Sequence, residues 1–253
     1  MAFEHYRHAL LDAADVRDSR LLIAREGPVE VRYAPFDYVT PTARLVILGI
    51  TPGATQADAA IREAGAALRT GASDLQALAR AKPHASFAGA MRTNLVAMLD
   101  HVRVNDALGI ASCATLWERD VHLVQFASAL RYPVFVNGKN YTGSSPKMTA
   151  SPLLREQLLT HTSRELAALP DALVLPLGPA VVDACRFLVR EGMLDPARVI
   201  EGLPHPSGAN GERIAYFLGR KERDRLSKKT DPGRIDTGRD AARRTIGRWR
   251  DAA

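Results

Sequence analysis

Arg44-Leu-Val-Ile-Leu-Gly-Ile-Thr-Pro-Gly53 is the stretch of sequence that decides the fold. Its first half is a short, continuous apolar run that ends at glycine, which is typical of a strand buried on both faces of a parallel sheet. Its second half is a tight turn, and residues 56–81, which follow it, favour a helix. A strand, a turn and a helix in this order form the repeating unit of parallel α/β proteins.

The rest of the chain continues this alternation. Apolar runs predict further strands at residues 121–128, 172–178 and 198–203. Helical spacing predicts helices at residues 4–25, 86–99, 152–169 and 179–191, and another from Gly211 into the C-terminal tail. Residues 134–146 are rich in Gly, Asn and Ser and are expected to form a loop. We therefore expect an α/β fold with a mostly parallel sheet and helices on both faces, in a single domain spanning residues 1–253.

Composition narrows the class of protein. Hydrophobic residues make up 46% and charged residues 25% of the chain, as in ordinary globular proteins. Cys113 and Cys185 lie far apart without a C-x-x-C spacing, which argues against a disulfide framework, a zinc site or an iron–sulfur cluster. No apolar run approaches the roughly 20 residues of a membrane span. We expect a cytoplasmic monomer without a metal or other cofactor and without a membrane partner.

Positive charge is concentrated near the C-terminus. The formal net charge is +6, and Lys and Arg outnumber Asp and Glu between Arg220 and Arg250. This basic extension, near residues 220–253, is either a solvated tail helix or a surface for phosphate groups. Charge alone does not decide between the two.

Three segments that follow predicted strands carry polar or glycine-rich sequence. They are the turn Gly49–Gly53, the Asn-rich loop after Phe135, and His205–Asn210. Ligands of open α/β sheets bind at the carboxyl ends of the strands. Each segment alone is common, but their combination in this order is specific enough to predict a functional site.

Together these segments resemble the uracil-DNA glycosylase superfamily. Gly49-Ile-Thr-Pro-Gly53 resembles its first motif, G-x-x-P-G, and His205-Pro-Ser-Gly-Ala-Asn210 resembles its second, which begins H-P-S. Between them, Phe87-Ala-Gly-Ala-Met-Arg92 resembles F-V-G-R-A-G, and Leu175-Pro-Leu-Gly178 followed by Pro179-Ala180 resembles the step before the last strand. The resemblance covers residues 44–219 and is most specific at its two ends.

The resemblance implies a three-layer α/β/α fold with a central, mostly parallel four-stranded sheet. It also implies a DNA glycosylase that flips out a base and hydrolyses its N-glycosidic bond. His205 would donate a hydrogen bond to the departing anionic base, and Phe87 would stack on that base, unless Phe87 is a core aromatic. Gly49 and Ile50 would line the base pocket. The residues expected to touch DNA are Pro52, Gly53, Lys139, Pro206, Ser207, Gly208 and Asn210.

The base-reading residue has three candidates. An Asn amide both donates and accepts hydrogen bonds, as base discrimination requires. Asn140 is favoured, Asn137 has the better spacing from Phe135 but sits in an ordinary Asn-Gly turn, and Ser128 ends the preceding strand. Lys139 in the same loop is expected to hold a phosphate.

Three departures from the superfamily pattern leave the excised base open. Thr51, the second expected catalytic residue, occupies a position that carries Asp, Glu, Gln or Asn in several classes. Its hydroxyl can hold water but is no general base. Gly208 stands where many members carry Pro. The helix-prone insertion near residues 54–82 is either a surface helix or a lid on a wider pocket, which would suit a modified base.

Two other functions compete with a monofunctional glycosylase. One is a DNA-binding protein that kept the fold and lost the chemistry, as Thr51 would allow. The other is an enzyme acting on a free nucleotide, although no G-x-x-x-x-G-K-[ST] phosphate loop is present. A role in repair or in defence against foreign DNA is equally open. The glycosylase interpretation expects His205 and residues 50–53 to face one pocket.

Overall fold

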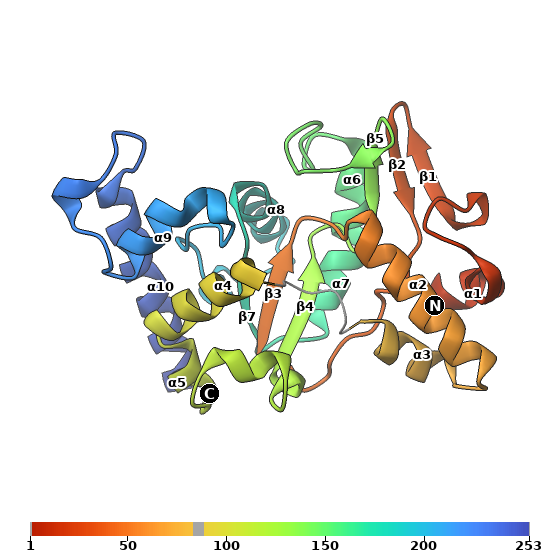
Figure 1. Ribbon diagram of the computed structural model, residues 1–253, viewed down its shortest axis with the longest axis horizontal. Helices are drawn as coiled ribbons and strands as arrows, with labels where there is room; N and C mark the ends of the chain where they lie inside the picture. Colours follow the sequence, from red (N-terminus) through yellow and green to blue (C-terminus); the bar gives the residue numbers. More distant parts are fainter. Residues whose placement is uncertain (1, 83–88, 253) are drawn as a thin grey trace. The chain divides into compact units, whose positions relative to one another are not determined.

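The computed structural model describes residues 2–82 and 89–252 and shows a mixed α/β fold (Figure 1). The chain forms two compact units. Unit 1 consists of Met1–Val39, Gly49–Ser86 and Phe126–Ala168, and unit 2 of Thr40–Leu48, Phe87–Gln125 and Leu169–Ala253. The expectation of a single domain stays a prediction. Within the described ranges, no helix has the length and apolar character needed to cross a membrane.

The helices and strands of the two units are as follows. Unit 1 contains α1 (Ala2–Asp12), β1 (Leu22–Glu26), β2 (Val29–Arg32), α2 (Ala54–Arg69), α3 (Asp74–Ala81), β5 (Val134–Val136), β6 (Lys139–Asn140), α6 (Pro152–Gln157) and α7 (Ser163–Ala167). Unit 2 contains α4 (Gly89–His101), α5 (Val104–Leu108), β7 (Leu173–Pro176), α8 (Pro179–Arg190), α9 (Gly211–Phe217) and α10 (Pro232–Ala252). Strands β3 (Leu45–Gly49) and β4 (Val124–Ser128) begin in unit 2, and their last residues belong to unit 1.

The predicted buried strand after Arg44 is the centre of a parallel sheet. The sheet has the order β4-β3-β7, and β3 pairs in parallel with β7 so that Leu45 lies opposite Leu173. The first four residues of β3 are all buried, as their apolar run predicts. The strand expected at residues 198–203 is reduced to an isolated parallel bridge between Val174 and Val199. The described sheet therefore has three strands, with a single bridge beside β7.

Unit 1 contains a second sheet, which the sequence reading missed. Its order is β1-β2-β5-β6, with antiparallel pairing between β1 and β2, β2 and β5, and β5 and β6. The prediction of one helix over residues 4–25 is wrong, because α1 ends at Asp12 and β1 begins at Leu22. The side chains of Asp15 and Asp18 accept hydrogen bonds from the backbone N–H groups of Arg17 and Arg20. Such local bonds compete with helix formation.

The loop expected at residues 134–146 begins instead as a hairpin. Strands β5 and β6 pair across the turn Asn137-Gly138, whose φ angles are 48° and 72°. Positive φ at both central residues is the geometry that Asn-Gly favours in a hairpin turn. The conformation of the hairpin turn therefore explains the presence of Asn at position 137.

The basic tail is an integral helix of unit 2. Ile235, Ala242 and Ile246 of α10 are buried, and the indole Nε1 of Trp249 donates to the carbonyl oxygen of Asp171 at 2.6 Å. The backbone of α10 at Gly238 also touches Gly202. A Cβ added at Gly238 would lie 2.6 Å from the Gly202 carbonyl oxygen, which is closer than real Cβ atoms come.

This contact predicts opposite effects for two glycine substitutions in α10. Gly238→Ala should lower the free energy of unfolding by about 1–3 kcal/mol, because the methyl group overpacks the contact with Gly202. Gly247→Ala is the matched control, since a Cβ there meets nothing within 4 Å. It should raise the free energy of unfolding by up to about 1 kcal/mol through helix propensity. Urea denaturation measures both, and a stabilising Gly238→Ala would contradict the contact.

Candidate functional site

His205 lies just beyond the segment that bridges to β7, against the first turn of α8. Its ring is half-buried and packs on Gly178, the residue that precedes α8 and has a φ of 90°. A Cβ added at Gly178 would lie 3.0 Å from His205 Cδ2. Both the positive φ and the ring contact favour glycine at this position.

The protonation of the His205 imidazole is set by its own loop. The backbone N–H of Ser207 donates to Nδ1 of His205 at 3.2 Å, so Nδ1 carries no proton. The proton of the neutral ring is then on Nε2. Burial lowers the pKa of His205 below its ordinary value of 6.5. At neutral pH His205 is therefore a neutral imidazole with Nε2–H as its hydrogen-bond donor.

Hydrogen bonds from neighbouring elements hold this loop. The side chain of Asn94 on α4 donates to the carbonyl oxygen of Pro206 at 3.0 Å. Asn210 Nδ2 donates to Ser207 Oγ at 3.1 Å, and Arg213 Nη1 donates to Asn210 Oδ1 at 2.8 Å. Two of the predicted DNA contacts, Ser207 and Asn210, thus bind each other in the free chain. Pro206 is buried, so it shapes the turn and offers no surface to DNA.

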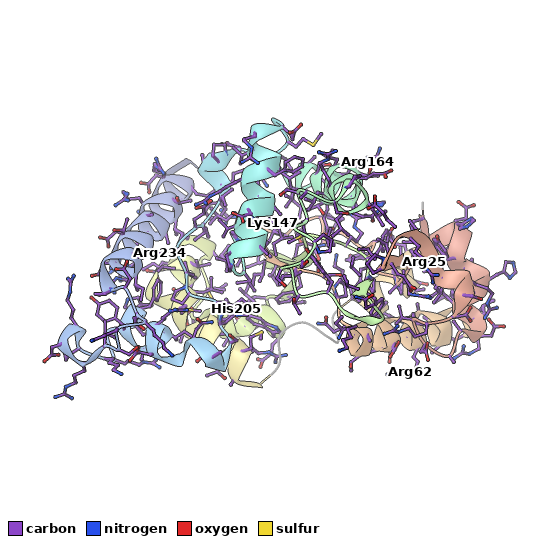
Figure 2. The ribbon with its side chains drawn as sticks, turned by 90° about the horizontal axis from the view of Figure 1, so that it is seen from above. Arg25, Arg62, Lys147, Arg164, His205 and Arg234 are labelled. Carbon is purple, nitrogen blue, oxygen red and sulfur yellow. The ribbon has the colours of Figure 1, made fainter. Side chains whose placement is uncertain are left out.

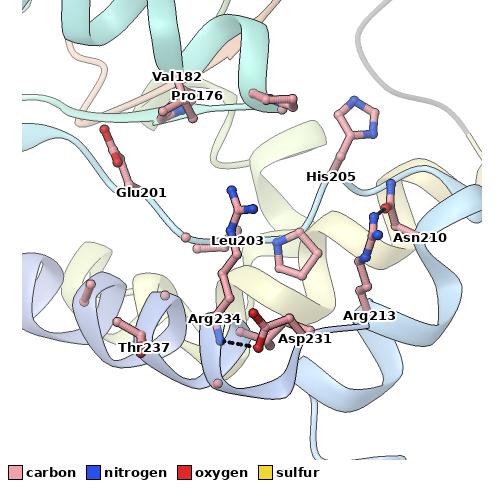
Figure 3. Close-up of a pocket in the computed structure, with 18 of the residues that line it drawn as sticks. Pro176, Val182, Glu201, Leu203, His205, Asn210, Arg213, Asp231, Arg234 and Thr237 are labelled. Carbon is pink, nitrogen blue, oxygen red and sulfur yellow. Dashed lines mark hydrogen bonds between the residues drawn. The ribbon is translucent and has the colours of Figure 1, made fainter. Parts of the chain in front are cut away.

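A cleft of about 1160 Å³ borders this loop within unit 2. Its walls are the first turns of α8, residues 201–205, and the beginning of α10. Figure 3 shows His205 at one end of the cleft, close to Asn210 and Arg213, while Arg234 rises from α10 toward Leu203. Gly208 is exposed beside it.

The first motif lies in unit 1, where Thr51 has a structural role. Its hydroxyl donates to the carbonyl oxygen of Tyr132 at 3.0 Å and accepts from the backbone N–H of Val134 at 3.1 Å. The carbonyl oxygens of Gly49 and Ile50 accept from Ala129 and Leu130 at 2.8 and 2.9 Å. The turn is therefore tied to the segment that follows β4, and the Thr51 hydroxyl has no further proton to donate.

Asn140 joins this turn through space. Its Oδ1 accepts from the backbone N–H of Ala54 at 3.1 Å, and its Nδ2 would lie 3.4 Å from a Cβ added at Gly53. The structure thus brings Asn140 to Gly53, while Asn137 lies in the hairpin turn. Exposed Lys139 precedes Asn140 in β6, and Ser128 ends β4.

Two backbone N–H groups at the end of the first motif are already occupied. Gly53 N–H donates to the Gln56 side chain at 3.1 Å, and Ala54 N–H binds Asn140. The expected DNA contact of Gly53 is corrected in that its N–H already has an internal acceptor. Pro52 is buried and shapes the turn, so its predicted DNA contact is also corrected.

The two motifs lie in different units. Thr51 belongs to unit 1 and His205 to unit 2, so their expected common pocket stays a prediction. Phe87, predicted to stack on the base, lies outside the described residues.

A buried polar network in unit 1 escaped the sequence reading. Asp37 accepts from the hydroxyls of Tyr33 and Tyr132 at 2.8 and 2.5 Å. Nearby, Glu165 pairs with Arg131 at 3.0 Å and with Lys82 at 3.3 Å, and burial lowers the pKa of Lys82. The network reaches the first motif, because the Tyr132 carbonyl accepts from Thr51. Across residues 2–82 and 89–252, no three His, Cys, Asp or Glu side chains are grouped as a metal site requires.

Comparison with known proteins gives one clear relative. The chain is 36% identical over 220 residues to the uncharacterized protein YoxB of Bacillus subtilis (strain 168), covering 86% of each chain. No protein-family profile and no solved structure matches the chain.

The position of Thr51 predicts a stability effect. Thr51→Val should lower the free energy of unfolding by about 1–3 kcal/mol, because the Tyr132 carbonyl and the Val134 N–H lose a partner. Thr51→Ser keeps the hydroxyl and should cost less. Denaturant unfolding of both variants is the measurement. A Val variant as stable as the wild type would show that the hydroxyl serves something other than the turn.

The environment of His205 predicts its tautomer. Imidazole ¹⁵N spectra should show the proton of the neutral ring on Nε2, with a titration midpoint below about 6.5. The downward shift follows because burial disfavours the charged ring. A proton on Nδ1, or a midpoint above that value, would contradict the Ser207 hydrogen bond and the burial.

Proposed function

We propose that this chain, which belongs to the same family as YoxB of Bacillus subtilis, is a monofunctional DNA glycosylase. In this proposal it has the three-layer fold of the uracil-DNA glycosylase superfamily, and the bridge at Val199 takes the place of a fourth strand. It acts on DNA as a monomer and leaves an abasic site. The reaction uses water and calls for no cofactor.

The hydrogen bond from the Ser207 N–H to Nδ1 of the half-buried His205 is the observation that carries the proposal, because it leaves Nε2–H as the donor of the neutral ring. When an N-glycosidic bond breaks, the sugar becomes an oxocarbenium-like cation and the base leaves with negative charge on its carbonyl oxygen. A fixed N–H donor directed at that oxygen stabilises the transition state more than the ground state. His205 supplies such a donor, since Ser207 occupies the other ring nitrogen.

Asn140 is our candidate for reading the base. Its Oδ1 is held by the Ala54 N–H, which fixes the orientation of the amide and leaves Nδ2 as the group on offer. An N–H donor pairs with a carbonyl oxygen and not with an exocyclic amino group. This favours bases that carry a carbonyl at the recognised edge, such as uracil, hypoxanthine or xanthine, over cytosine and adenine.

The remaining groups limit the chemistry. Thr51 is engaged in the turn, so water would attack the sugar cation without a general base from this position. Lys82 is buried and paired with Glu165, so it is not presented as an amine nucleophile. The engaged Thr51 favours a modest rate, and the buried Lys82 favours base excision without strand cleavage.

A second candidate function is DNA binding without turnover. It is favoured by the same Thr51, whose hydroxyl is used within the fold. In that case the chain would bind DNA equally well with and without His205 and would release no base from any substrate.

Base release with matched histidine variants tests the proposal. Single- and double-stranded oligonucleotides carrying uracil, hypoxanthine, xanthine or modified cytosines are incubated with wild type, His205→Ala and His8→Ala. The wild type should produce abasic sites on at least one substrate. His205→Ala should be slower by about 10²–10³-fold, the usual cost of losing one preorganised donor.

His8→Ala is the control for this comparison, because His8 is exposed on α1. It should match the wild type. DNA binding is measured in parallel for all three proteins. Binding without base release in the wild type would reject the glycosylase and leave the DNA-binding candidate.

A further inference from the structure

Helix α10 has one buried and one exposed face. Its buried face includes Ile235, Ala242 and Ile246. Residues 234, 237, 241, 244 and 248 follow one another at spacings of three or four, so they share a different face. We call Arg234, Thr237, Ala241, Arg244 and Arg248 the arginine stripe.

The three arginines of the stripe have no role in folding that the structure shows. Arg234, Arg244 and Arg248 are exposed, and their guanidinium groups make no ion pair or hydrogen bond with the described residues. Other arginines of α10 differ in this respect. Arg239 pairs with Asp236 at 2.6 Å, and Arg243 donates to the His101 carbonyl oxygen at 3.2 Å.

Charge on the stripe is of one sign. No acidic residue lies within it, because Thr237 and Ala241 occupy the positions between the arginines. Asp240 and Asp251 flank it, and Asp251 pairs with Arg250 at 3.0 Å, so the three arginines leave the face net positive. Three exposed guanidinium groups on one face, none of them used within the described fold, are available to an anionic partner.

The stripe also runs along the cleft that ends at His205. Arg234, Thr237 and Ala241 line that cleft, and Figure 2 labels Arg234 on α10. Small side chains at 237 and 241 leave room for a backbone to approach. Arg213 and Lys229 add positive charge to the same cleft, which is also lined by the carboxylates Asp183, Glu201 and Asp231.

The length of the stripe suits a nucleic-acid strand. Arg248 is fourteen residues beyond Arg234, which corresponds to about 21 Å along a helix. One strand of duplex DNA places about six phosphates in that length. Guanidinium groups bind phosphate oxygens in a bidentate manner, so three arginines can engage three phosphates.

We propose that the arginine stripe docks the phosphate backbone of DNA that flanks the nucleotide presented to His205. This inference rests on DNA being the substrate in the proposed function. It assigns binding energy to a face of α10 outside the two motifs.

Salt dependence of DNA binding tests the stripe. The triple variant Arg234→Gln, Arg244→Gln, Arg248→Gln should lower the magnitude of the slope of log K against log salt concentration by about two to three. The matched control is Arg62→Gln, Arg80→Gln, Arg155→Gln, which removes the same charge from exposed positions of unit 1. It should keep the wild-type slope. A triple Arg→Lys variant of the stripe should restore most of the slope.

Two outcomes would overturn the proposal. In one, the stripe and control variants have the same slope. In the other, the stripe variant keeps its DNA slope and loses binding to vesicles of anionic phospholipid, which would identify a membrane surface as the partner. Base release is scored separately at saturating DNA. Absence of base release by the wild type would reject the glycosylase. The difference in salt slope between the stripe and control variants tests the arginine stripe alone.

Discussion

The hydrogen bond from the Ser207 backbone N–H to Nδ1 of His205 determines what the candidate site can do. Because it occupies one ring nitrogen as an acceptor, it places the proton on the other, and burial keeps the ring neutral. Gly178 allows the ring to approach α8, and Asn94 holds the turn from α4. These contacts make the Nε2–H group of His205 the hydrogen-bond donor of the candidate site.

The same loop connects the site to the basic C-terminal helix. Gly202 precedes His205 by three residues and touches Gly238 of α10 without any side chain between the two backbones. The helix that carries the arginine stripe is therefore anchored on the segment that carries the histidine. In the proposed function, a helix fixed in this way would hold DNA at a defined distance from His205, which a flexible basic tail would not do.

Sequence patterns predicted the local parts of this account. The apolar run of β3 and the glycine after it depend on neighbours in the chain, and the buried strand is confirmed. The pairing of β2 with β5, the contact of Asn140 with Ala54, and the contact of Gly202 with Gly238 join residues far apart in the chain. Hydrophobic periodicity in the sequence does not reveal such long-range pairs. The Asn-Gly dipeptide at 137 was the one local sign of the hairpin.

The rate of base release as a function of pH tests the central claim most directly. With a substrate found by base release, single-turnover rates of the wild type should be constant near neutral pH. They should fall on the acid side with a midpoint below about 6.5, because protonation of Nδ1 breaks the Ser207 hydrogen bond that orients the ring, and burial lowers the pKa of His205. A rate that rises as His205 becomes protonated would mean that the charged ring is the active form, and would contradict the account.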